Sequence, residues 1–291
     1  MRVGGLIDAH LHLAALDAAI GIPPEQVLRR GVIAAVDAGT FGADDFPAAR
    51  AVWKATLPVR AFANLVPRGL RGEQPWAAPP DEDPVAPFRD FEADGIKVRL
   101  GTAVERDDAA DLARAKRAAR ACRLPLMVHA TGARIDPDDL LDALDAGDVL
   151  THCFCTGSFS LIDAAGQVRA SAHRARARGV RFDLARGSQH FDRDVARAAL
   201  GRGFAPDFVS TDATSRTWGA APVFDLFHVL AEIVSLGMAA EDALAAVTTR
   251  PAAFYGFSLP APTASAFVEL DDALRCVRIC RDGFTIVERN A

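Results

Sequence analysis

The regular alternation of short apolar runs with helix-like stretches constrains the fold of this chain more than any other feature of its sequence. Strands that are buried on both faces of a parallel sheet read as short apolar runs bounded by turn residues. Eight such runs occur, and their spacing is about that of a βα unit. They are Gly5–His10, Val32–Asp37, Val59–Leu65, Gly95–Leu100, Leu124–Ala130, Asp148–Phe154, Val180–Leu184 and Asp207–Asp212.

Helix-like segments separate these runs. Asp107–Cys122 has acidic residues at its start and basic residues toward its end, as the helix dipole favours, and Asp136–Ala146 begins with a capping residue. Such alternation predicts a parallel α/β sheet, and eight units predict a closed (β/α)8 TIM barrel. An open, doubly wound sheet with six or seven real strands is the alternative.

The character of the chain changes near Pro260. Two helical segments, Val223–Met238 and Ala240–Thr248, come before this point. Three short strands are expected after it: Ala266–Leu270, Arg275–Cys280 and Phe284–Glu288. We therefore expect a barrel over residues 1–259 and a small C-terminal β appendage over residues 260–291.

Composition excludes several classes of partner. The 291 residues carry a net charge of −5, which provides no electrostatic footprint for nucleic acid or an anionic membrane surface. Apolar runs are too short for a membrane helix, and the N-terminus lacks the features of a signal peptide. Five cysteines form no disulfide framework, which suits a reducing compartment. We expect a cytoplasmic protein with a small-molecule substrate and no nucleic-acid or membrane partner; a homo-oligomer is compatible with the sequence.

Histidines and one aspartate lie where several predicted strands end. His10 and His12 are two residues apart in an extended segment, so both imidazoles point to the same face. His129, His152 and Asp212 follow the fifth, sixth and eighth runs. Taken singly, each could be a packed core residue or a helix cap. Because barrel active sites form at the C-terminal ends of the strands, their shared position predicts a site for Zn²⁺ or a similar divalent ion.

Lys97 lies in the middle of the fourth run, and it is one of only three lysines, with Lys54 and Lys116, among the 33 basic residues. Its side chain could snorkel from a strand edge. If it points inward, an ammonium beside a dication is strongly repelled and must be neutralised or modified. Carboxylation by CO₂ would convert the cation into an anion whose two oxygens can bridge two metal ions.

This set resembles that of the binuclear branch of the amidohydrolase superfamily. Members carry a His-x-His pair, a carboxylated lysine, two further histidines and an aspartate on strands one, four, five, six and eight. The resemblance extends from Gly5 to about Gly256. It implies two divalent metal ions, zinc or manganese, bridged by carboxylated Lys97. The matching residues are His10, His12, Lys97, His129, His152 and Asp212.

Within the superfamily, the chain is similar to the dihydroorotase-like amidohydrolase/deacetylase subgroup. The motifs that carry this similarity are GVIAAVDAGT (31–40), GIKVR (95–99), GDVLTHCF (147–154), PDFVSTD (206–212) and VTTRPAAFYG (247–256). Three features depart from the pattern. Relatives usually have some tens of residues of β-sandwich before the first strand, whereas the first strand is expected here from Gly5, and Leu13-Ala14 stand where dihydroorotases have a carboxylate-binding arginine. Residues 185–190 (ARGSQH) replace a Gly-His-Gly loop, which leaves the substrate open.

The ligand set implies a hydrolytic mechanism. Two ions would share a hydroxide, since bound water becomes far more acidic, and this hydroxide would attack a carbonyl polarised by one metal. Asp212 would act as general base and then as general acid toward the leaving group. We therefore predict a metal-dependent, deacetylase-like hydrolase of an amide or ester that bears a carboxylate.

Residues for substrate recognition are expected at the ends of the strands and in the loops that follow them. Arg99 lies two residues beyond Lys97 and therefore faces the same side of its strand, unless it passes the strand end and reaches solvent. Arg134, Arg186 and Arg216 follow strands five, seven and eight, where they could clamp a carboxylate or form surface salt bridges. His190 could contact the substrate or cap the following helix.

Two other functions were weighed against the binuclear hydrolase. A mononuclear deaminase of the same superfamily lacks the bridging lysine and has an acidic residue near the fifth-strand histidine, whereas this chain has Lys97 and continues as Ala130-Thr131 after His129. A non-catalytic binding barrel would not need the complete ligand set. Both alternatives are therefore less consistent with the sequence.

Overall fold

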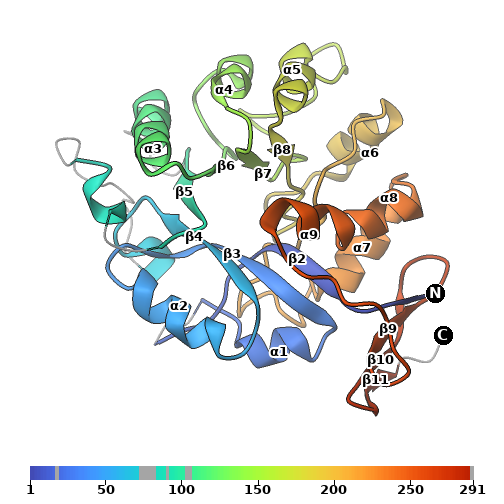
Figure 1. Ribbon diagram of the computed structural model, residues 1–291. Coiled ribbons are helices and arrows are strands. Elements are labelled where there is room, and N and C mark those ends of the chain that lie inside the picture. Colours follow the sequence, from blue (N-terminus) through green and yellow to red (C-terminus); the bar gives the residue numbers. More distant parts are fainter. Residues whose placement is uncertain (17–19, 72–82, 90–91, 102–106, 289–291) are drawn as a thin grey trace.

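The computed structural model describes residues 1–16, 20–71, 83–89, 92–101 and 107–288. Within them, a sheet of seven parallel strands follows the chain order and curls upon itself, with helices on its outer side (Figure 1). This confirms the predicted α/β barrel architecture. The strands are β2 (Leu6–Leu11), β3 (Val32–Gly42), β4 (Val59–Asn64), β5 (Gly95–Arg99), β6 (Leu126–His129), β7 (Val149–Thr151) and β8 (Arg181–Phe182).

The predicted eighth strand, Asp207–Asp212, forms no regular strand but occupies the eighth position. A bridge between Asp183 and Phe208 joins it to β8, and a bridge between Leu11 and Ala213 joins it to β2. The amide of Asp212 also donates to the carbonyl of His10 (2.8 Å). These contacts on both sides close the barrel. Asp212, the last residue of the segment, has a φ of 49°, which ends the extended conformation there.

Helices cover the outside of the sheet, and several begin at an aspartate cap. Asp107 accepts hydrogen bonds from the amides of Ala109 and Ala110, and Asp136 caps the next helix in the same way. The predicted helix Ala240–Thr248 is shorter and ends at Ala245, and a further helix begins at Thr249. The helices are α1 (Pro24–Leu28), α2 (Phe46–Lys54), η1 (Gly69–Arg71), η2 (Ala86–Phe88), α3 (Asp108–Cys122), α4 (Pro137–Ala143), α5 (Ala170–Arg178), α6 (Arg193–Gly201), α7 (Leu226–Ser235), α8 (Ala240–Ala245) and α9 (Thr249–Tyr255).

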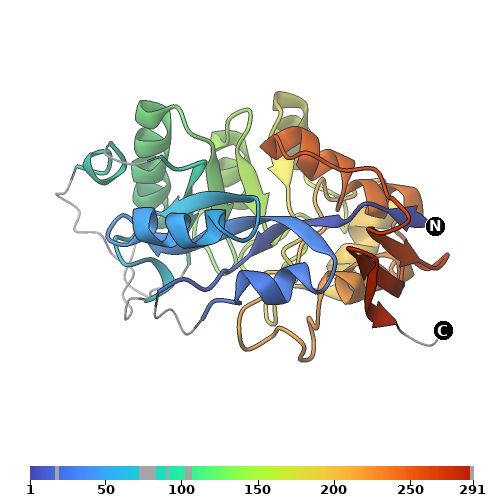
Figure 2. The ribbon, with the colours of Figure 1, turned by 60° about the horizontal axis from the view of Figure 1, so that its bottom comes forward.

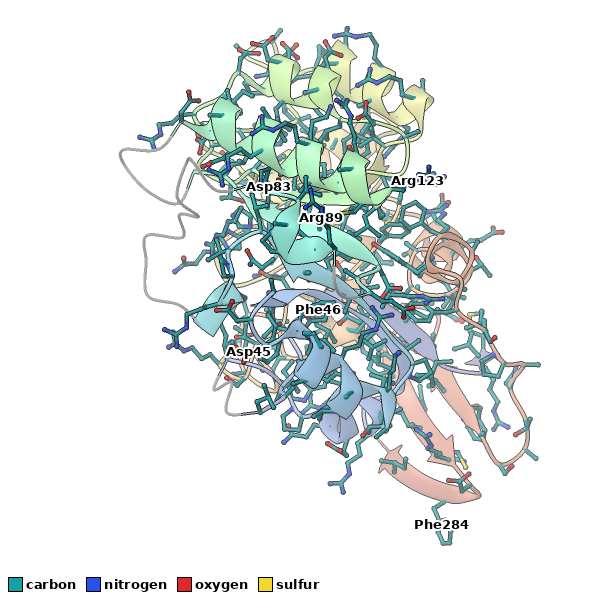
Figure 3. The ribbon with its side chains drawn as sticks, turned by 60° about the vertical axis from the view of Figure 1, so that its left-hand side comes forward. Asp45, Phe46, Asp83, Arg89, Arg123 and Phe284 are labelled. Carbon is teal, nitrogen blue, oxygen red and sulfur yellow. The ribbon has the colours of Figure 1, made fainter. Side chains whose placement is uncertain are left out.

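A second, antiparallel sheet combines both ends of the chain. It contains β1 (Arg2–Val3), β9 (Phe267–Leu270), β10 (Cys276–Arg281) and β11 (Phe284–Glu288), in the order β1-β9-β10-β11. Residues 2–3 thus pair with the tail, although they fall within the range predicted for the barrel (Figure 2). The sheet lies beside the barrel, and Phe284 projects away from both with 76% of its surface exposed (Figure 3).

Apolar side chains fill the barrel below the histidines. Phe62, Met127, Val149 and Phe208 pack together there with Tyr255, the last residue of α9, and all five are buried. Because apolar side chains fill this end of the barrel, the polar side chains of the strands lie at the opposite, C-terminal ends. Among the helices within the described ranges, none has both the length and the apolar character needed to cross a membrane.

Candidate metal centre

A pocket of about 220 Å³ opens at the C-terminal ends of the barrel strands, and all of the predicted metal ligands line it. Arg99 and His190 line it as well. The strand ends bring these residues together although they are spread over some two hundred positions of the chain. Three of the ends depart from regular backbone: His152, Ala185 and Asp212 have φ values of 57°, 40° and 49°. Strained backbone of this kind persists where the surrounding structure holds it, and it is concentrated at functional sites.

His10, His12 and Asp212 form the first group of converging ligand atoms. The Nε2 atoms of His10 and His12 lie 3.4 Å and 3.2 Å from the same oxygen, Oδ1 of Asp212. Two imidazole nitrogens and a carboxylate oxygen are therefore directed at one point. This donor set suits Zn²⁺ or a similar divalent ion.

The opposite nitrogens of these two rings are held by buried partners. Nδ1 of His10 lies 2.8 Å from Oδ2 of Asp183 and 2.9 Å from the hydroxyl of Thr151. Nδ1 of His12 lies 2.9 Å from the hydroxyl of Thr40, which donates in turn to Asp37 (2.6 Å). Metal-binding histidines are typically oriented by a carboxylate or another acceptor at the second nitrogen. The arrangement therefore fits a metal site better than a core of packed histidines.

His129, His152 and His190 form the second group. Their ring centroids are 4.4 to 4.8 Å apart. Nδ1 of His152 lies 2.7 Å from the carbonyl oxygen of Ala185, so this nitrogen donates and Nε2 is left as the lone-pair donor. Burial lowers the pKa of both His129 and His152 well below the usual range, so both rings are neutral at pH 7 and able to bind a metal.

Lys97 lines the same pocket as the two groups. It is only 5% exposed, and within the described residues its Nζ atom has no hydrogen-bond partner. Burial lowers the pKa of the amine to about 7, against the attraction of Asp212 and Asp183. Gly39, with a φ of 88°, makes room for the lysine, because a Cβ there would lie 2.7 Å from the Cβ of Lys97. The inward orientation is observed, and snorkelling from a strand edge is wrong.

The charges in the site are balanced by proton sharing. Burial would raise the pKa of Asp212, but hydrogen bonds with His10 and His12 outweigh burial and hold it well below the usual range. Burial and Lys97 lower the pKa of His10, but its hydrogen bonds with Asp183 and Asp212 raise it overall. These hydrogen bonds favour a proton on His10, and a divalent cation bound between His10 and Asp212 would displace it.

The residues predicted for substrate recognition separate into two groups. Arg99 and His190 line the pocket, whereas the other three lie outside its lining as far as the chain is described. Arg186 is held by Glu232, with Nε 2.9 Å from a carboxylate oxygen, and Arg134 and Arg216 are exposed. Substrate recognition by these three arginines stays a prediction. The helix-capping role considered for His190 is also wrong, because Asp192 caps α6.

Some residues that build the site escaped the sequence analysis. Asp183 and Asp37 are completely buried and hold the first histidine pair, while Gly39 makes space for Lys97. A carboxylate inside an otherwise apolar strand was a usable signal, since charged side chains are almost never fully buried unless they are paired. The need for a glycine at position 39 could not be predicted, because it arises from Lys97 on β5, which is separated from β3 by β4 in the sheet.

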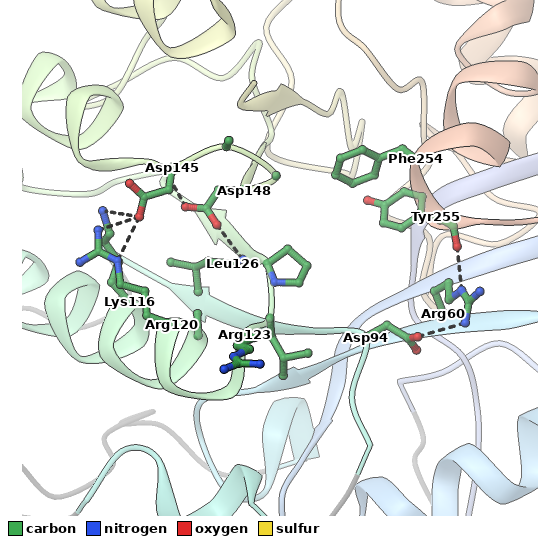
Figure 4. Close-up of a pocket in the computed structure, with 15 residues that line it drawn as sticks. Arg60, Asp94, Lys116, Arg120, Arg123, Leu126, Asp145, Asp148, Phe254 and Tyr255 are labelled. Carbon is green, nitrogen blue, oxygen red and sulfur yellow. Dashed lines mark hydrogen bonds and ion pairs between the residues drawn. The ribbon is translucent and has the colours of Figure 1, made fainter. Parts of the chain in front are cut away.

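A larger cavity of about 580 Å³ lies at the opposite, N-terminal ends of the strands (Figure 4). Its charged groups are mostly paired: Arg60 with Asp94 (3.2 Å), and Lys116 with Asp145 (3.2 Å). Asp148 accepts from the backbone amide of Leu126. These ion pairs are structural, because Arg60–Asp94 joins β4 to the start of β5 and Lys116–Asp145 joins α3 to the segment before β7.

Curated proteins resemble this chain over most of its length. A deacetylase of Brucella anthropi is 29% identical over 273 residues, which cover 88% of this chain and 66% of the relative. A deacetylase of Enterococcus faecalis is 29% identical over 262 residues, which cover 85% of this chain and 70% of the relative. The chain thus spans about two thirds of the length of these relatives. No protein-family model matches it.

Solved structures share the fold. The crystal structure of a dihydroorotase matches with a TM-score of 0.76 at 28% identity, covering 87% of this chain and 71% of that one. The crystal structure of an adenine deaminase matches with a TM-score of 0.77 at 24% identity, covering 98% of this chain and 86% of that one. The second likeness concerns the fold alone.

Proposed function

We propose that this chain, which belongs to the amidohydrolase superfamily and has deacetylases among its sequence relatives, is a metal-dependent hydrolase that cleaves an amide or ester bond. One observation carries the proposal. The imidazoles of His10 and His12 converge on Asp212, their outer nitrogens are held by Asp183 and Thr40, and the amine of Lys97 lies buried beside them. A purely structural core would have no use for a buried amine without a partner.

Six residues would hold two divalent ions, zinc or manganese, with Lys97 between them. When bound, such ions acidify a water molecule and polarise a carbonyl group. The neutral imidazoles of His129 and His152 and the carboxylate of Asp212 already have the protonation states that ligands need. The ligand residues are His10, His12, Lys97, His129, His152 and Asp212.

Lys97 is suited to carboxylation because its pKa of about 7 leaves much of the amine neutral. The Nζ lone pair attacks the carbon of CO₂, a C–N bond forms, and one proton leaves to solvent. The product is a carbamate with a single negative charge, which suits the place between two cations.

Asp212 transfers the proton during the reaction. Its Oδ1 atom faces the imidazoles of His10 and His12, and its side chain is 14% exposed at the pocket. The ionised carboxylate accepts the proton from the attacking water and delivers it to the departing amine or alcohol. A positioned acid–base group of this kind contributes typically 10²- to 10⁴-fold to the rate.

The substrate is a small acylated acid. The guanidinium of Arg99 lines the pocket, and within the described residues its Nε atom has no hydrogen-bond partner. A planar donor pair in this position recognises a carboxylate. The five cysteines are free thiols, in keeping with the cytoplasm as the compartment.

The test combines metal analysis with turnover. Protein purified with bicarbonate and without chelator should contain about two equivalents of zinc or manganese and should hydrolyse N-acetyl or O-acetyl acids. Lys97→Ala should abolish turnover, while Lys54→Ala, which changes an exposed lysine at the end of α2, should not. One equivalent of metal with deamination of amino-substituted rings would replace this function by a mononuclear deaminase. If the protein takes up no metal even after reconstitution, the hydrolase is excluded and a non-catalytic binding barrel replaces it as the function.

A further inference from the structure

The loop that follows β8 brings a third imidazole to the second group of ligand atoms. Building on the metal centre of the proposed function, we propose that His190 is a direct ligand of the second metal ion. That ion is then held by the three imidazoles of His129, His152 and His190, together with Lys97. The His-x-His pair and Asp212 hold the first ion, to which His190 does not contribute.

The geometry of the three rings supports coordination. One nitrogen from each ring lies within 4.8 Å of one from each of the others. Two nitrogens on one zinc ion, each at about 2.1 Å, are at most about 4.2 Å apart. A small rotation of the His190 ring, which is carried by a loop, therefore brings the set into range. The rings of His129 and His152 lie at the barrel wall and are buried.

The backbone of the loop aims His190 at the site. Gly187 has a φ of 53°, and its amide donates to the carbonyl of Thr211 (2.9 Å). A Cβ at Gly187 would lie 2.5 Å from Oδ2 of Asp212 and 3.2 Å from the ring of His190. Only glycine fits here, and its presence allows His190 and Asp212 to face the same pocket.

Neighbouring contacts hold this loop in place. Arg186 forms an ion pair with Glu232 (2.9 Å) and lies over the ring of Phe191. The amide of Asp192 donates to the carbonyl of Phe154 (2.8 Å), close to His152. A residue between two such anchors keeps its direction, as a metal ligand requires.

The helix-capping role that His190 could have is filled by another residue. Asp192 caps the following helix, so His190 is not needed there. Within the described part of the chain, Nδ1 of His190 is buried without a hydrogen-bond partner. A buried polar atom without a partner costs free energy, and a metal bond at either nitrogen fixes the ring and its tautomer.

With His190 as a ligand, the second ion depends less on the carbamate of Lys97. Three imidazoles already form the protein side of a tetrahedral site with one open position. The second ion should therefore survive loss of the carbamate with lowered affinity, instead of depending on it. The carbamate is then required for the bridge between the ions and for turnover.

The test is a titration of the metal-free full-length chain with Co²⁺ and with Zn²⁺, read by cobalt absorption and by competition with a chelating dye. Wild type should bind two ions. His190→Phe, which keeps a ring of similar size, should weaken one of them by at least about 100-fold and leave the other unchanged. Gln189→Ala, an exposed neighbour in the same loop, is the matched control and should bind as wild type. His190→Asp, which supplies a carboxylate in place of the imidazole, should recover part of the lost affinity.

The Lys97 variants provide the second arm. Lys97→Ala should retain two ions, and Lys97→Ala combined with His190→Phe should retain one. Wild-type affinity at both sites in His190→Phe would overturn the assignment, as would loss of the second ion in Lys97→Ala alone. Failure of wild type to bind any ion is a different result, because it removes the proposed function itself. Circular dichroism of each variant separates loss of a ligand from loss of the fold.

Discussion

Nδ1 of His10 lies 2.8 Å from Oδ2 of Asp183, and both side chains are buried inside the barrel. The other oxygen of Asp183 accepts a hydrogen bond from the hydroxyl of Ser210, and Thr151 donates to Oδ2 (3.0 Å). Asp183, which is itself held by Thr151 and Ser210, therefore fixes the ring of His10 and leaves Nε2 directed at Asp212.

Replacing Asp183 by Asn should weaken metal binding by about 10- to 100-fold, because an outer carboxylate orients the ring and raises its basicity. Competition titration with a chelating dye measures this change directly. Asp145→Asn, at the other end of the strands, serves as the control and should leave metal affinity unchanged. Equal affinities for Asp183→Asn and wild type would show that Asp183 only supports the fold.

The stability of the metal-free, CO₂-free protein should depend on pH through Lys97. The pKa of this amine is about 7 in the folded chain and 10.5 when unfolded. Between these values the unfolded chain binds more protons, so the free energy of unfolding rises with pH, by up to about 1.4 kcal/mol per unit. Lys97→Met should lack this contribution, so its advantage over wild type should be largest below pH 7 and shrink toward pH 10. Urea unfolding across this range measures the difference, and a constant gap would contradict the depressed pKa.

Gly39→Ala should disrupt the site strongly, although it adds only one methyl group. The new methyl group would meet Lys97 at 2.7 Å on a backbone with a φ of 88°. We expect a loss of roughly 1–3 kcal/mol in the free energy of unfolding together with lost turnover. Gly147→Ala is a matched control, since its φ is also 88° but nothing lies within 4 Å of the added Cβ. Turnover should survive in Gly147→Ala, and its loss there would assign the effect to backbone strain alone.

Removal of metal should lower thermal stability. An ion that binds only the folded chain stabilises it by about 4 kcal/mol at a concentration 1,000 times its dissociation constant. For a chain of this size, that corresponds to a rise in Tm of roughly 10 °C. Thermal unfolding followed by circular dichroism, with and without a chelator, tests the expectation. An unchanged Tm after verified metal removal would contradict it.

Arg99→Met should discriminate between substrates. Loss of charge-assisted hydrogen bonds should raise KM about 10- to 100-fold for an acylated acid and leave its neutral methyl ester unaffected. Arg216→Met changes an exposed arginine outside the pocket lining and should affect neither substrate. Equal losses for acid and ester would indicate that Arg99 positions the metal ligands instead of the substrate.

Much of the metal centre could be predicted from local sequence. The apolar runs that lead into His129 and His152 placed these residues at strand ends, and the parallel topology requires that such ends meet. His10 and His12 share a face because side chains alternate along a strand. Closure of the barrel was also predictable, although the irregular backbone at Asp212 was not, because that conformation is imposed by contacts with β2 and β8.

The direction of each loop could not be predicted in the same way. Arg99 is the last residue of β5 and lines the pocket, whereas Arg186 follows the end of β8 by four residues and pairs with Glu232 of α7 outside the pocket lining. His190, three residues beyond Gly187, returns to the pocket because that glycine allows a turn against Asp212. Both outcomes depend on residues that are distant in the sequence.

The sequence by itself determined which chemistry this protein can carry, since the alternation of strands and helices places its histidines, Lys97 and Asp212 at one end of a barrel. Only the tertiary structure decided which candidate ligand atoms converge, which of the arginines lines the pocket, and which glycines make room for these side chains. The physical reason is that strand periodicity is a local property. Packing and ion pairs between distant segments direct the loops, and those contacts exist only when the barrel has closed.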